Sequence, residues 1–485
     1  MLCLNVFALA LWWAETTAWP SQSYKSETFV IPEFNVTKSG KPLAPGYLFL
    51  TPAAAPYPAS IIITDEGELV WASHADTFSN LNVQTLDSTP VLTYWEGVGS
   101  PNPQTQGHGY GQVQILDSSY TVTHTICPDL SLSTEGATEV KCQADLHESY
   151  VTERGSVLVT AYNITEADLS DMNGPEQGWI YDCLIFEIDI ETQNILFTWS
   201  ALRSGILLTD SKQAIGESGT QSNPYDVFHV NSAQAVEGGY LINSRHTWTT
   251  YFVNSEGDIQ WHFEGSTGGD FTLPPETHFS WQHHVRILNG SSTSVVLSLF
   301  DNANAEPPLS GVNQTLGLLF SLDLQSKSAT LLKEYKDPEQ PLFVDSQGAL
   351  SILANGNALQ GYGQIPVIKE YGPDGDVRLS VQFGDLDDQQ QSSYRAYRLE
   401  WEAVPAADPA VFAEQGHAYA SWNGATQVHE WDIFQGATAE SVVHTHSVKK
   451  VGFETKVAIS NTTKFVKVAA VCGAGKRDSA VVAVA

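Results

Sequence analysis

The stretch His229–Phe263 reads HVNSAQAVEGGYLINSRHTWTTYFVNSEGDIQWHF and decides the fold class of this chain. It contains four short segments of alternating apolar and polar residues, separated by glycine or polar turns: His229–Val236, Tyr240–His246, Thr249–Asn254 and Asp258–Phe263. Four short antiparallel strands in about 35 residues are typical of one blade of a β-propeller. A single such sheet cannot bury both of its faces, so several blades must stack around an axis.

The same strand–turn–strand unit recurs along the 485 residues. Clear or looser copies lie at Ile61–Trp71, Tyr251–Phe263, Ile185–Trp199, Leu318–Leu332 and Val367–Val381, with fainter ones at Val113–Thr125 and near Glu430–Val443. Their spacing of about 50 to 70 residues predicts an all-β propeller of six blades, with seven as the alternative. A chain of separate β-sandwich domains would not explain why one hairpin pattern repeats.

The two ends of the chain depart from this pattern. Leu4–Trp13 is an apolar run followed by small residues, so residues 1–18 are interpreted as a signal peptide and the protein as secreted. Residues 19–57 are expected to form an N-terminal β extension, 58–447 the propeller and 448–485 a C-terminal β-strand tail. The two ends are expected either to pair as a small cap or sandwich, or to close the ring.

Charge restricts the possible partners. Lys and Arg number 23 against 55 Asp and Glu, which gives a net charge of −32. Such a surface repels nucleic acid and anionic membranes, so neither is expected as a partner. The apolar run at the N-terminus is too short to span a bilayer, and no later stretch comes close to that length. The sequence leaves the oligomeric state open.

Cysteines and glycosylation signals agree with export. Outside the signal peptide the cysteines are Cys127, Cys142, Cys183 and Cys472, which allow three pairings. We expect the local pair Cys127–Cys142, which would leave Cys183–Cys472 to tie the tail to the body. Five N-x-S/T sequons are candidate sites of N-glycosylation: Asn35, Asn163, Asn289, Asn313 and Asn461.

Histidines recur at the same position of successive blades. His147 lies in ADLHE, His229 in DVFHVN and His283 in SWQHH, each just before or at the first strand of a blade. Because first strands line the axis of a propeller, we expect these side chains to meet at one mouth of the channel. The following strands end in SRH, with Arg245, and in FDN, with Asn302.

Strand alternation refines this set. His229 and Asn231 are two residues apart, so on a regular strand their side chains share a face. The neighbours His283 and His284 cannot both point inward unless a bulge intervenes. A metal site with Asp145, Glu148 or Asp226 as supporting carboxylates is a weaker alternative, and we predict none. No G-x-S-x-G motif occurs, and a glycosidase carboxylate pair would not stand out among so many acids.

Several of these motifs together resemble the arylsulfotransferase (ASST) family, particularly its fungal branch. They are WQHHVRIL followed by LSLFDNANA, DVFHVNSAQ followed by LINSRHT, DLHESYVTERGSVLVTAY, and SWNGATQVHEW. The resemblance extends over roughly Pro45–Phe434. It implies a propeller enzyme that moves a sulfuryl group from an aryl sulfate to a phenol without the nucleotide donor PAPS and without another cofactor.

The resemblance also implies residue roles. His283 corresponds to the histidine that accepts the sulfuryl group, with His284 as the neighbouring alternative. Arg245, with its planar fork, suits the sulfate oxygens. His147, His229 and Asn231 would donate hydrogen bonds and protonate the leaving phenolate. Asn231, Asn302 and His284 are expected to bind substrate. The alternative is a non-catalytic extracellular propeller that binds an aromatic or anionic ligand at the same mouth.

Overall fold

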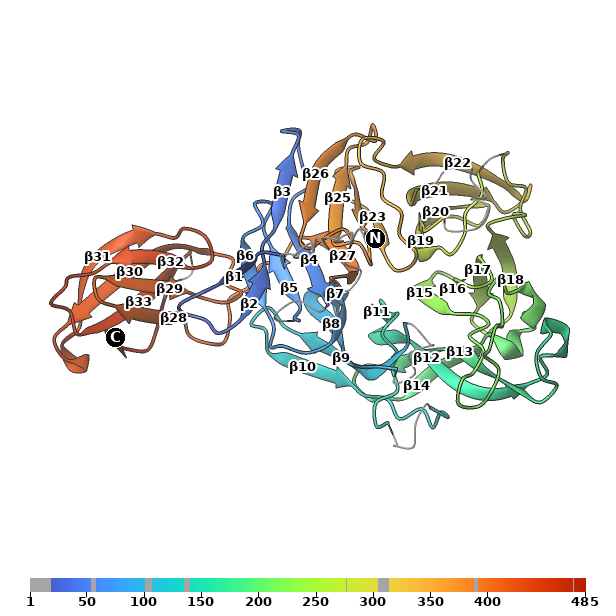
Figure 1. Ribbon diagram of the computed structural model, residues 1–485, viewed down its shortest axis with the longest axis horizontal. Helices are drawn as coiled ribbons and strands as arrows, with labels where there is room; N and C mark the ends of the chain where they lie inside the picture. Colours follow the sequence, from blue (N-terminus) through green and yellow to red (C-terminus); the bar gives the residue numbers. More distant parts are fainter. Residues whose placement is uncertain are drawn as a thin grey trace, which may run out of the picture.

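The structure is a computed structural model that describes residues 19–53, 58–100, 107–134, 140–275, 277–303, 314–387, 391–473 and 475–485. Within these residues the chain forms a ring of six sheets with a smaller β unit beside it (Figure 1). The fold is therefore an all-β propeller with six blades, as the sequence predicts. The predicted signal peptide lies outside the described residues. Among the described helices, none is long and apolar enough to cross a membrane.

Blades 1 to 4 each consist of four strands that follow one another from the centre of the ring outward. Blade 1 holds β7 (Phe78–Leu86), β8 (Thr89–Gly99), β9 (Gly109–Leu116) and β10 (Val122–Ile126). Blade 2 holds β11 (Ser149–Val151), β12 (Ser156–Ala167), β13 (Gly178–Asp189) and β14 (Ile195–Ser200). Blade 3 holds β15 (Val230–Val236), β16 (Gly239–Ser244), β17 (Thr249–Asn254) and β18 (Ile259–Glu264), within two residues of the predicted strands. Blade 4 holds β19 (His283–Gly290), β20 (Ser294–Asp301), β21 (Leu316–Asp323) and β22 (Ser328–Tyr335).

Blades 5 and 6 combine strands from both ends of the chain. Blade 5 holds β23 (Ala349–Ile352), β24 (Ala358–Gly361), β25 (Val367–Tyr371) and β26 (Val377–Gln382), with β3 (Asn35–Lys38) on its outer edge. Blade 6 holds β27 (Ser393–Leu399) at the centre, followed by β4 (Tyr47–Pro52), β5 (Ile61–Ile63) and β6 (Leu69–Ala72). The antiparallel pairing of β27 with β4 closes the ring. The N-terminal segment 19–57 is thus not a separate extension, because β3 and β4 are blade strands.

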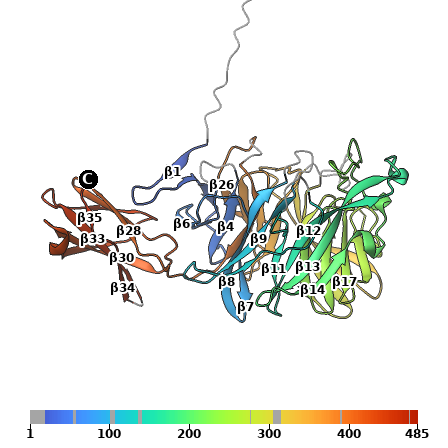
Figure 2. The same ribbon diagram turned by 90° about the horizontal axis from the view of Figure 1, so that it is seen from below.

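The C-terminal part differs from its predicted boundary. Strands β28 (Ala410–Glu414), β29 (His417–Ser421) and β32 (Thr455–Ala458) form one sheet, and β30 (Val428–Gly436), β31 (Val443–Lys449), β33 (Phe465–Cys472), β34 (Gly475–Asp478) and β35 (Val482–Ala483) form a second. The expected division at residue 447 is wrong, since it cuts β31, and the propeller ends with β27. The two sheets bury a shared core that includes Trp431, and they lie to one side of the ring (Figure 2).

The remaining elements are short. A hairpin of β1 (Ser21–Ser23) and β2 (Val30–Pro32) precedes the ring strands. Four single-turn 3-10 helices occur in the described residues: η1 (Ser170–Met172), η2 (Leu202–Ser204), η3 (Leu208–Asp210) and η4 (Ala439–Ser441).

The core of the ring is divided among the gaps between blades. Each pair of neighbouring blades buries one apolar cluster between them. A middle strand therefore contributes one face to the cluster on one side of its blade and the other face to the cluster on the other side. On β12, for example, Val157 and Val159 face blade 1, whereas Leu158 and Tyr162 face blade 3. This two-sided burial explains why the middle strands contain apolar residues at consecutive positions.

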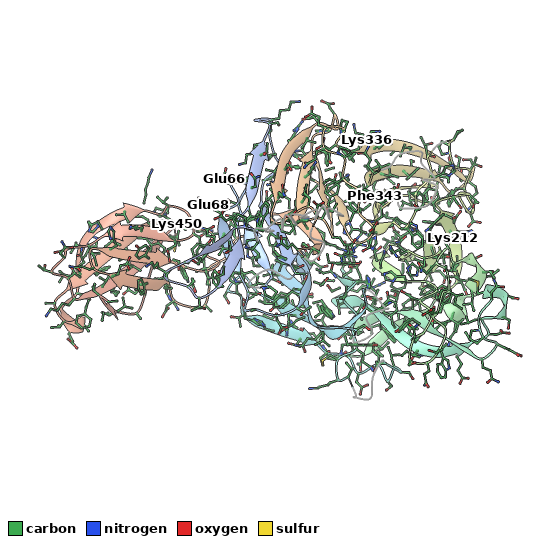
Figure 3. All side chains as sticks on the ribbon, in the orientation of Figure 1. Glu66, Glu68, Lys212, Lys336, Phe343 and Lys450 are labelled. Carbon is green, nitrogen blue, oxygen red and sulfur yellow. A yellow bond between two sulfur atoms is a disulfide. The ribbon has the colours of Figure 1, made fainter. Side chains whose placement is uncertain are left out.

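Direct contacts hold the C-terminal unit against blade 6. The side chain of Asn423 accepts from and donates to the backbone of Ala72, at 3.0 and 2.8 Å. Beside it, the ring of Phe453 lies 4.6 Å from that of Tyr24 in the turn between β1 and β2. Lys450 lies close to Glu68 at this junction (Figure 3). Burial lowers the pKa of Lys450, and Glu68 offsets part of that effect.

The structure contains one of the two expected disulfides. Cys127 and Cys142 are bonded, which ties the end of β10 to the segment before blade 2. The expected pair Cys183–Cys472 is wrong, because Cys183 is buried in β13 between blades 2 and 3 whereas Cys472 belongs to the C-terminal unit.

Candidate functional site

The inner strands begin around a single cavity of about 370 Å³. Every blade contributes to its wall at the start of its innermost strand, or just before it: Phe78, His147, His229, His283, Gln347 and Tyr394. Arg245, which follows β16, also lines it. The four side chains that the sequence brought forward as catalytic candidates, His147, His229, Arg245 and His283, therefore share one cavity.

Two of the histidines are held by buried carboxylates. Nδ1 of His147 lies 2.6 Å from Oδ2 of Asp145, and Nδ1 of His229 lies 2.6 Å from Oδ2 of Asp226. The rings of His147 and His229 are 4.9 Å apart. A carboxylate only accepts hydrogen bonds when ionised, so each Nδ1 carries the proton. In the neutral form of each ring the lone pair then lies on Nε2, and no hydrogen bond to that atom is made within the described residues.

The charges of these pairs are set by burial and by each other. Burial lowers the pKa of His229 well below its ordinary value, and Asp226 offsets only part of this, so the imidazole is neutral at pH 7. Burial alone would raise the pKa of Asp226, but His229, His108 and His246 outweigh it and hold that pKa well below its usual range. The pKa of Asp145 is lowered in the same way, because His147 and His108 outweigh the effect of burial.

His283 is fixed by an amide and a loop. Its Nδ1 donates to Oδ1 of Asn302 at 2.7 Å, and its Nε2 accepts the backbone N–H of Gln347 at 3.1 Å. Asn302 cannot be turned round, because its Nδ2 donates to the carbonyls of Val344 and Gln347, both at 3.1 Å. Burial first, and then Arg245, lower the pKa of His283 well below its ordinary value. The ring is a neutral imidazole, the form that is nucleophilic.

Arg245 supplies the positive charge of the cavity. Its Nη1 donates to Nε2 of His246 at 2.9 Å, its Nη2 donates to the carbonyl of Asp345 at 3.0 Å, and its guanidinium lies 4.9 Å from the ring centre of Trp281. No carboxylate forms an ion pair with it within the described residues. Burial lowers the pKa of Arg245 to about 10, so it stays protonated at neutral pH.

The doublet His283-His284 is resolved by a bulge. The pairing of β19 with β20 shifts register between His283 and Arg286, and His284 has a positive φ of 50°. His284 points between blades, where its Nδ1 donates to the carbonyl of Leu350 at 3.0 Å and its Nε2 lies 3.3 Å from the hydroxyl of Tyr397. It is not a wall of the cavity, so the expectation that it binds substrate does not agree with the structure.

The two asparagines proposed for substrate binding also lie outside the cavity wall. His229 has a φ of 48° and β15 shifts register between Val230 and Ser232, so the simple alternation that would place Asn231 beside His229 fails. Asn231 is fully buried and bonds to Asn243 at 2.7 Å and to the carbonyl of Gln282 at 3.0 Å. Asn302 holds His283, as described above. Both asparagines position other groups.

The sequence reasoning missed a third histidine in the network. His108 Nε2 lies 2.9 Å from the same Oδ2 of Asp226 that His229 contacts, and its ring is 5.2 Å from that of His229. The signal in the sequence is a histidine between glycines, G-H-G-Y-G, just before β9. His108, Asp226 and His229 place three ligand-type atoms within 4.8 Å of one another, a set that could hold a metal ion. In the structure Asp226 instead accepts hydrogen bonds from both rings.

A buried ion cluster lies close in the sequence to three residues of the cavity wall, His147, His283 and Tyr394. Glu148 pairs with Nη2 of Arg286 at 2.7 Å and with Nη1 of Arg395 at 3.1 Å. Burial alone would raise the pKa of Glu148, but the two arginines outweigh it and lower that pKa. The cluster joins the inner strands of blades 2, 4 and 6, because Glu148, Arg286 and Arg395 lie at or beside β11, β19 and β27. It therefore stabilises the backbone on which His147, His283 and Tyr394 stand.

A family comparison agrees with this site. The family model described as "Arylsulfotransferase (ASST)" matches residues 82–384, which run from within β7 of blade 1 to the end of β26 in blade 5 and include all four catalytic candidates. The chain belongs to the arylsulfotransferase family. No curated protein matches this family member.

Solved structures resemble this arylsulfotransferase-family protein only distantly. A protein of unknown function from Bacteroides caccae has a TM-score of 0.41 and 11% identity over 73% of this chain and 98% of its own. The GH43 BlXynB protein from Bacillus licheniformis has a TM-score of 0.31 and 8% identity over 91% and 88%. The Dos1 propeller has a TM-score of 0.25 and 12% identity over 76% and 71%.

Proposed function

We propose that this protein is a secreted sulfotransferase that moves a sulfuryl group from an aryl sulfate to a phenol, with His283 as the group that carries it. The observation that supports this most is the shared cavity of His147, His229, Arg245 and His283. A neutral buried imidazole, an arginine with no ion pair in the described part of the chain, and two carboxylate-bound histidines are the groups that a two-step transfer requires.

In the first step the lone pair on Nε2 of His283 attacks the sulfur of the aryl sulfate. The N–S bond forms as the bond between sulfur and the aryl oxygen breaks, and the electron pair leaves on the phenolate oxygen. Arg245 holds the sulfate oxygens through charge-assisted hydrogen bonds. In the second step a phenol oxygen attacks the same sulfur, and the N–S bond returns its electron pair to His283.

Proton movement belongs to the two His–Asp pairs. A neutral ring holds no proton on Nε2, so the first leaving group departs as the phenolate anion. Nε2 then takes the proton of the attacking phenol and can pass it to the phenolate that leaves in the next cycle. His147 and His229 have an Nε2 lone pair, and each has an ionised carboxylate behind it that stabilises the imidazolium. This replaces the role expected from the sequence, in which Asn231 shared the task.

Aromatic side chains suit the organic part of both substrates. Phe78, Trp95 and Tyr394 line the cavity together with hydroxyl and amide groups. A phenyl ring gains apolar and edge-to-face contacts there. Secretion is part of the proposal: the disulfide Cys127–Cys142 and the candidate signal peptide support it.

The test is to incubate the purified protein with a chromogenic aryl sulfate, with and without a phenol. Release that depends on phenol supports transfer, whereas release with water alone would make the protein a sulfatase. If no chromophore is released under either condition, the proposed sulfotransferase activity fails, and the result favours the alternative of a propeller that only binds a ligand. His283→Ala should abolish release, His284→Ala should not, and trapped wild-type protein should gain the mass of one SO₃ on the peptide that contains His283.

A further inference from the structure

The loop Asp345–Gly348 enters the cavity just before β23. Asp345, Ser346 and Gln347 all line the cavity wall, next to His283 and Arg245. The described wall contains one arginine, no lysine and one carboxylate, that of Asp345. A sulfuryl group has three oxygens that carry negative charge, and one guanidinium cannot satisfy all of them. Neutral donors are therefore needed from the backbone or from polar side chains.

Four hydrogen bonds fix this loop to the site. The carbonyl of Asp345 accepts from Arg245, and the carbonyl of Gln347 accepts from Asn302. The N–H of Gln347 donates to Nε2 of His283 at 3.1 Å, and the N–H of Gly348 donates to the carbonyl of Tyr394 at 3.0 Å. The arginine, the amide that holds the histidine, and the histidine itself are thus all bound by the same short loop.

The backbone of the loop is in an unfavourable conformation. Gln347 has a φ of 68° and Gly348 a φ of 101°, and a Cβ on Gly348 would lie 2.2 Å from a ring carbon of Phe300. A positive φ at a non-glycine residue persists only where the surroundings enforce it, and such positions concentrate at functional sites. Here the enforced conformation aims the Gln347 N–H at His283.

The tautomer of His283 decides what this N–H meets during transfer. Asn302 presents Oδ1 to Nδ1, so the proton lies on Nδ1 and the lone pair on Nε2 accepts the Gln347 N–H. When that lone pair forms a bond to sulfur, the N–H loses its acceptor. The atoms that then surround Nε2 are the sulfuryl oxygens, and these are hydrogen-bond acceptors.

We propose that the backbone N–H of Gln347 is a catalytic oxyanion donor, which passes from Nε2 of His283 to a sulfuryl oxygen as the N–S bond forms. The inference rests on the proposed function. The ligand of this donor is the transferred SO₃ group. Arg245, which contacts the loop at Asp345, binds another oxygen of the same group. The donor has no charge and keeps its proton, so the electron balance of both steps is unchanged.

The test compares two full-length proteins that differ in one atom of the backbone. Position 347 is replaced once by an α-hydroxy acid and once by the amino acid with the same side chain, so that only the first lacks the N–H. With a chromogenic aryl sulfate, we expect the single-turnover burst of phenol to be about 10²- to 10³-fold slower in the ester protein, the range for loss of one oxyanion donor. Equal burst rates in the two folded proteins would overturn the proposal.

One further variant keeps the result interpretable. If the ester protein does not fold, Gly348→Ala displaces the loop through Phe300 and should slow the burst, and an unchanged burst would contradict the proposal. If the wild type itself releases no phenol, the proposed function fails as a whole; a normal wild type with an equal pair overturns only the role of Gln347.

Discussion

Asp226 is the carboxylate on which most of the histidine network depends. Its Oδ2 accepts from His108 at 2.9 Å and from His229 at 2.6 Å, and its backbone carbonyl accepts from His246 at 2.5 Å. Because the carboxylate fixes the proton of His229 on Nδ1, it also fixes the lone pair on Nε2. The orientation and the tautomer of His229 are therefore set by a residue that lines a neighbouring cavity of about 410 Å³ as well.

Asp226→Asn tests this dependence. The amide keeps the shape but removes the charge that stabilises the imidazolium and can donate to Nδ1, which favours the wrong tautomer. We expect kcat for sulfuryl transfer to fall by about 10²- to 10⁴-fold, the range for loss of a carboxylate behind a catalytic histidine. The matched control is Asp182→Asn, since Asp182 is also buried but bonds to Ser200, at 2.7 Å, away from the cavity. Equal losses in the two variants would mean that Asp226 has only a structural role.

Asp301 gives a prediction of stability against pH. Burial raises its pKa from 3.8 to about 7, and its Oδ2 has no hydrogen-bond partner among the described residues. The folded state therefore holds the proton more tightly than the unfolded state, so stability is full below about pH 4, falls as the pH rises toward 7 and stays level above it. A shift of this size corresponds to a loss of about 4 kcal/mol at most.

Asp301→Asn should remove that loss. The amide oxygen can still accept the N–H groups of Ser280 and Ala303, and it cannot ionise. We expect urea unfolding to show the variant gaining stability relative to the wild type between pH 5 and pH 8. Any constant cost of the new amide N–H cancels in that comparison. A difference that is the same at both pH values would show that Asp301 does not titrate in this range.

Strands show where local pattern suffices and where it does not. The bounds of the blade 3 strands could be predicted to within two residues, because each strand pairs with the next one in the sequence across a short turn. The pairing of β4 with β27 joins residues about 350 positions apart, and nothing local in Tyr47–Pro52 indicates its partner. The histidines followed the blade repeat and could be found. His108 lies before β9, outside that repeated position, and its partner Asp226 is 118 positions away, so the repeat did not point to it.

The pairing of β27 with β4 predicts a sharp difference between two mutations in one strand pair. Ala396, paired with Leu50, is buried in the gap between blades 5 and 6, whereas Leu399, paired with Tyr47, is partly exposed at the strand end. Ala396→Lys places a charge in a dry core and should open the ring, with a loss of several kcal/mol in unfolding free energy and of all activity. Leu399→Lys should change stability by about 1 kcal/mol or less. Similar unfolding curves for both would contradict closure by this strand.

The whole molecule combines a rigid ring with an anionic surface. Six inner strands meet around one cavity, and ion clusters such as Glu148 with Arg286 and Arg395 lock those strands together. The C-terminal unit contacts blade 6 and contributes no residue to the cavity wall in the described part of the chain. The chain has a net charge of −32, while the cavity wall contains both Arg245 and Asp345, whose charges are opposite.

This arrangement makes the two halves of the proposed reaction differ in their response to salt. The aryl sulfate is an anion and must approach a protein of charge −32, whereas a phenol below its own pKa is neutral. Within the cavity wall the charges of Arg245 and Asp345 largely cancel at a distance, so the field of the whole surface governs the approach. Salt screens that field, because the Debye length falls to about 10 Å at 0.1 M.

We expect kcat/KM for the aryl sulfate to rise a few-fold on going from about 0.02 M to about 0.3 M NaCl, and kcat/KM for the phenol to stay constant. A fall in the donor value with salt would show that the local field of Arg245 outweighs the surface, and parallel changes for both substrates would indicate an effect of salt on the protein itself.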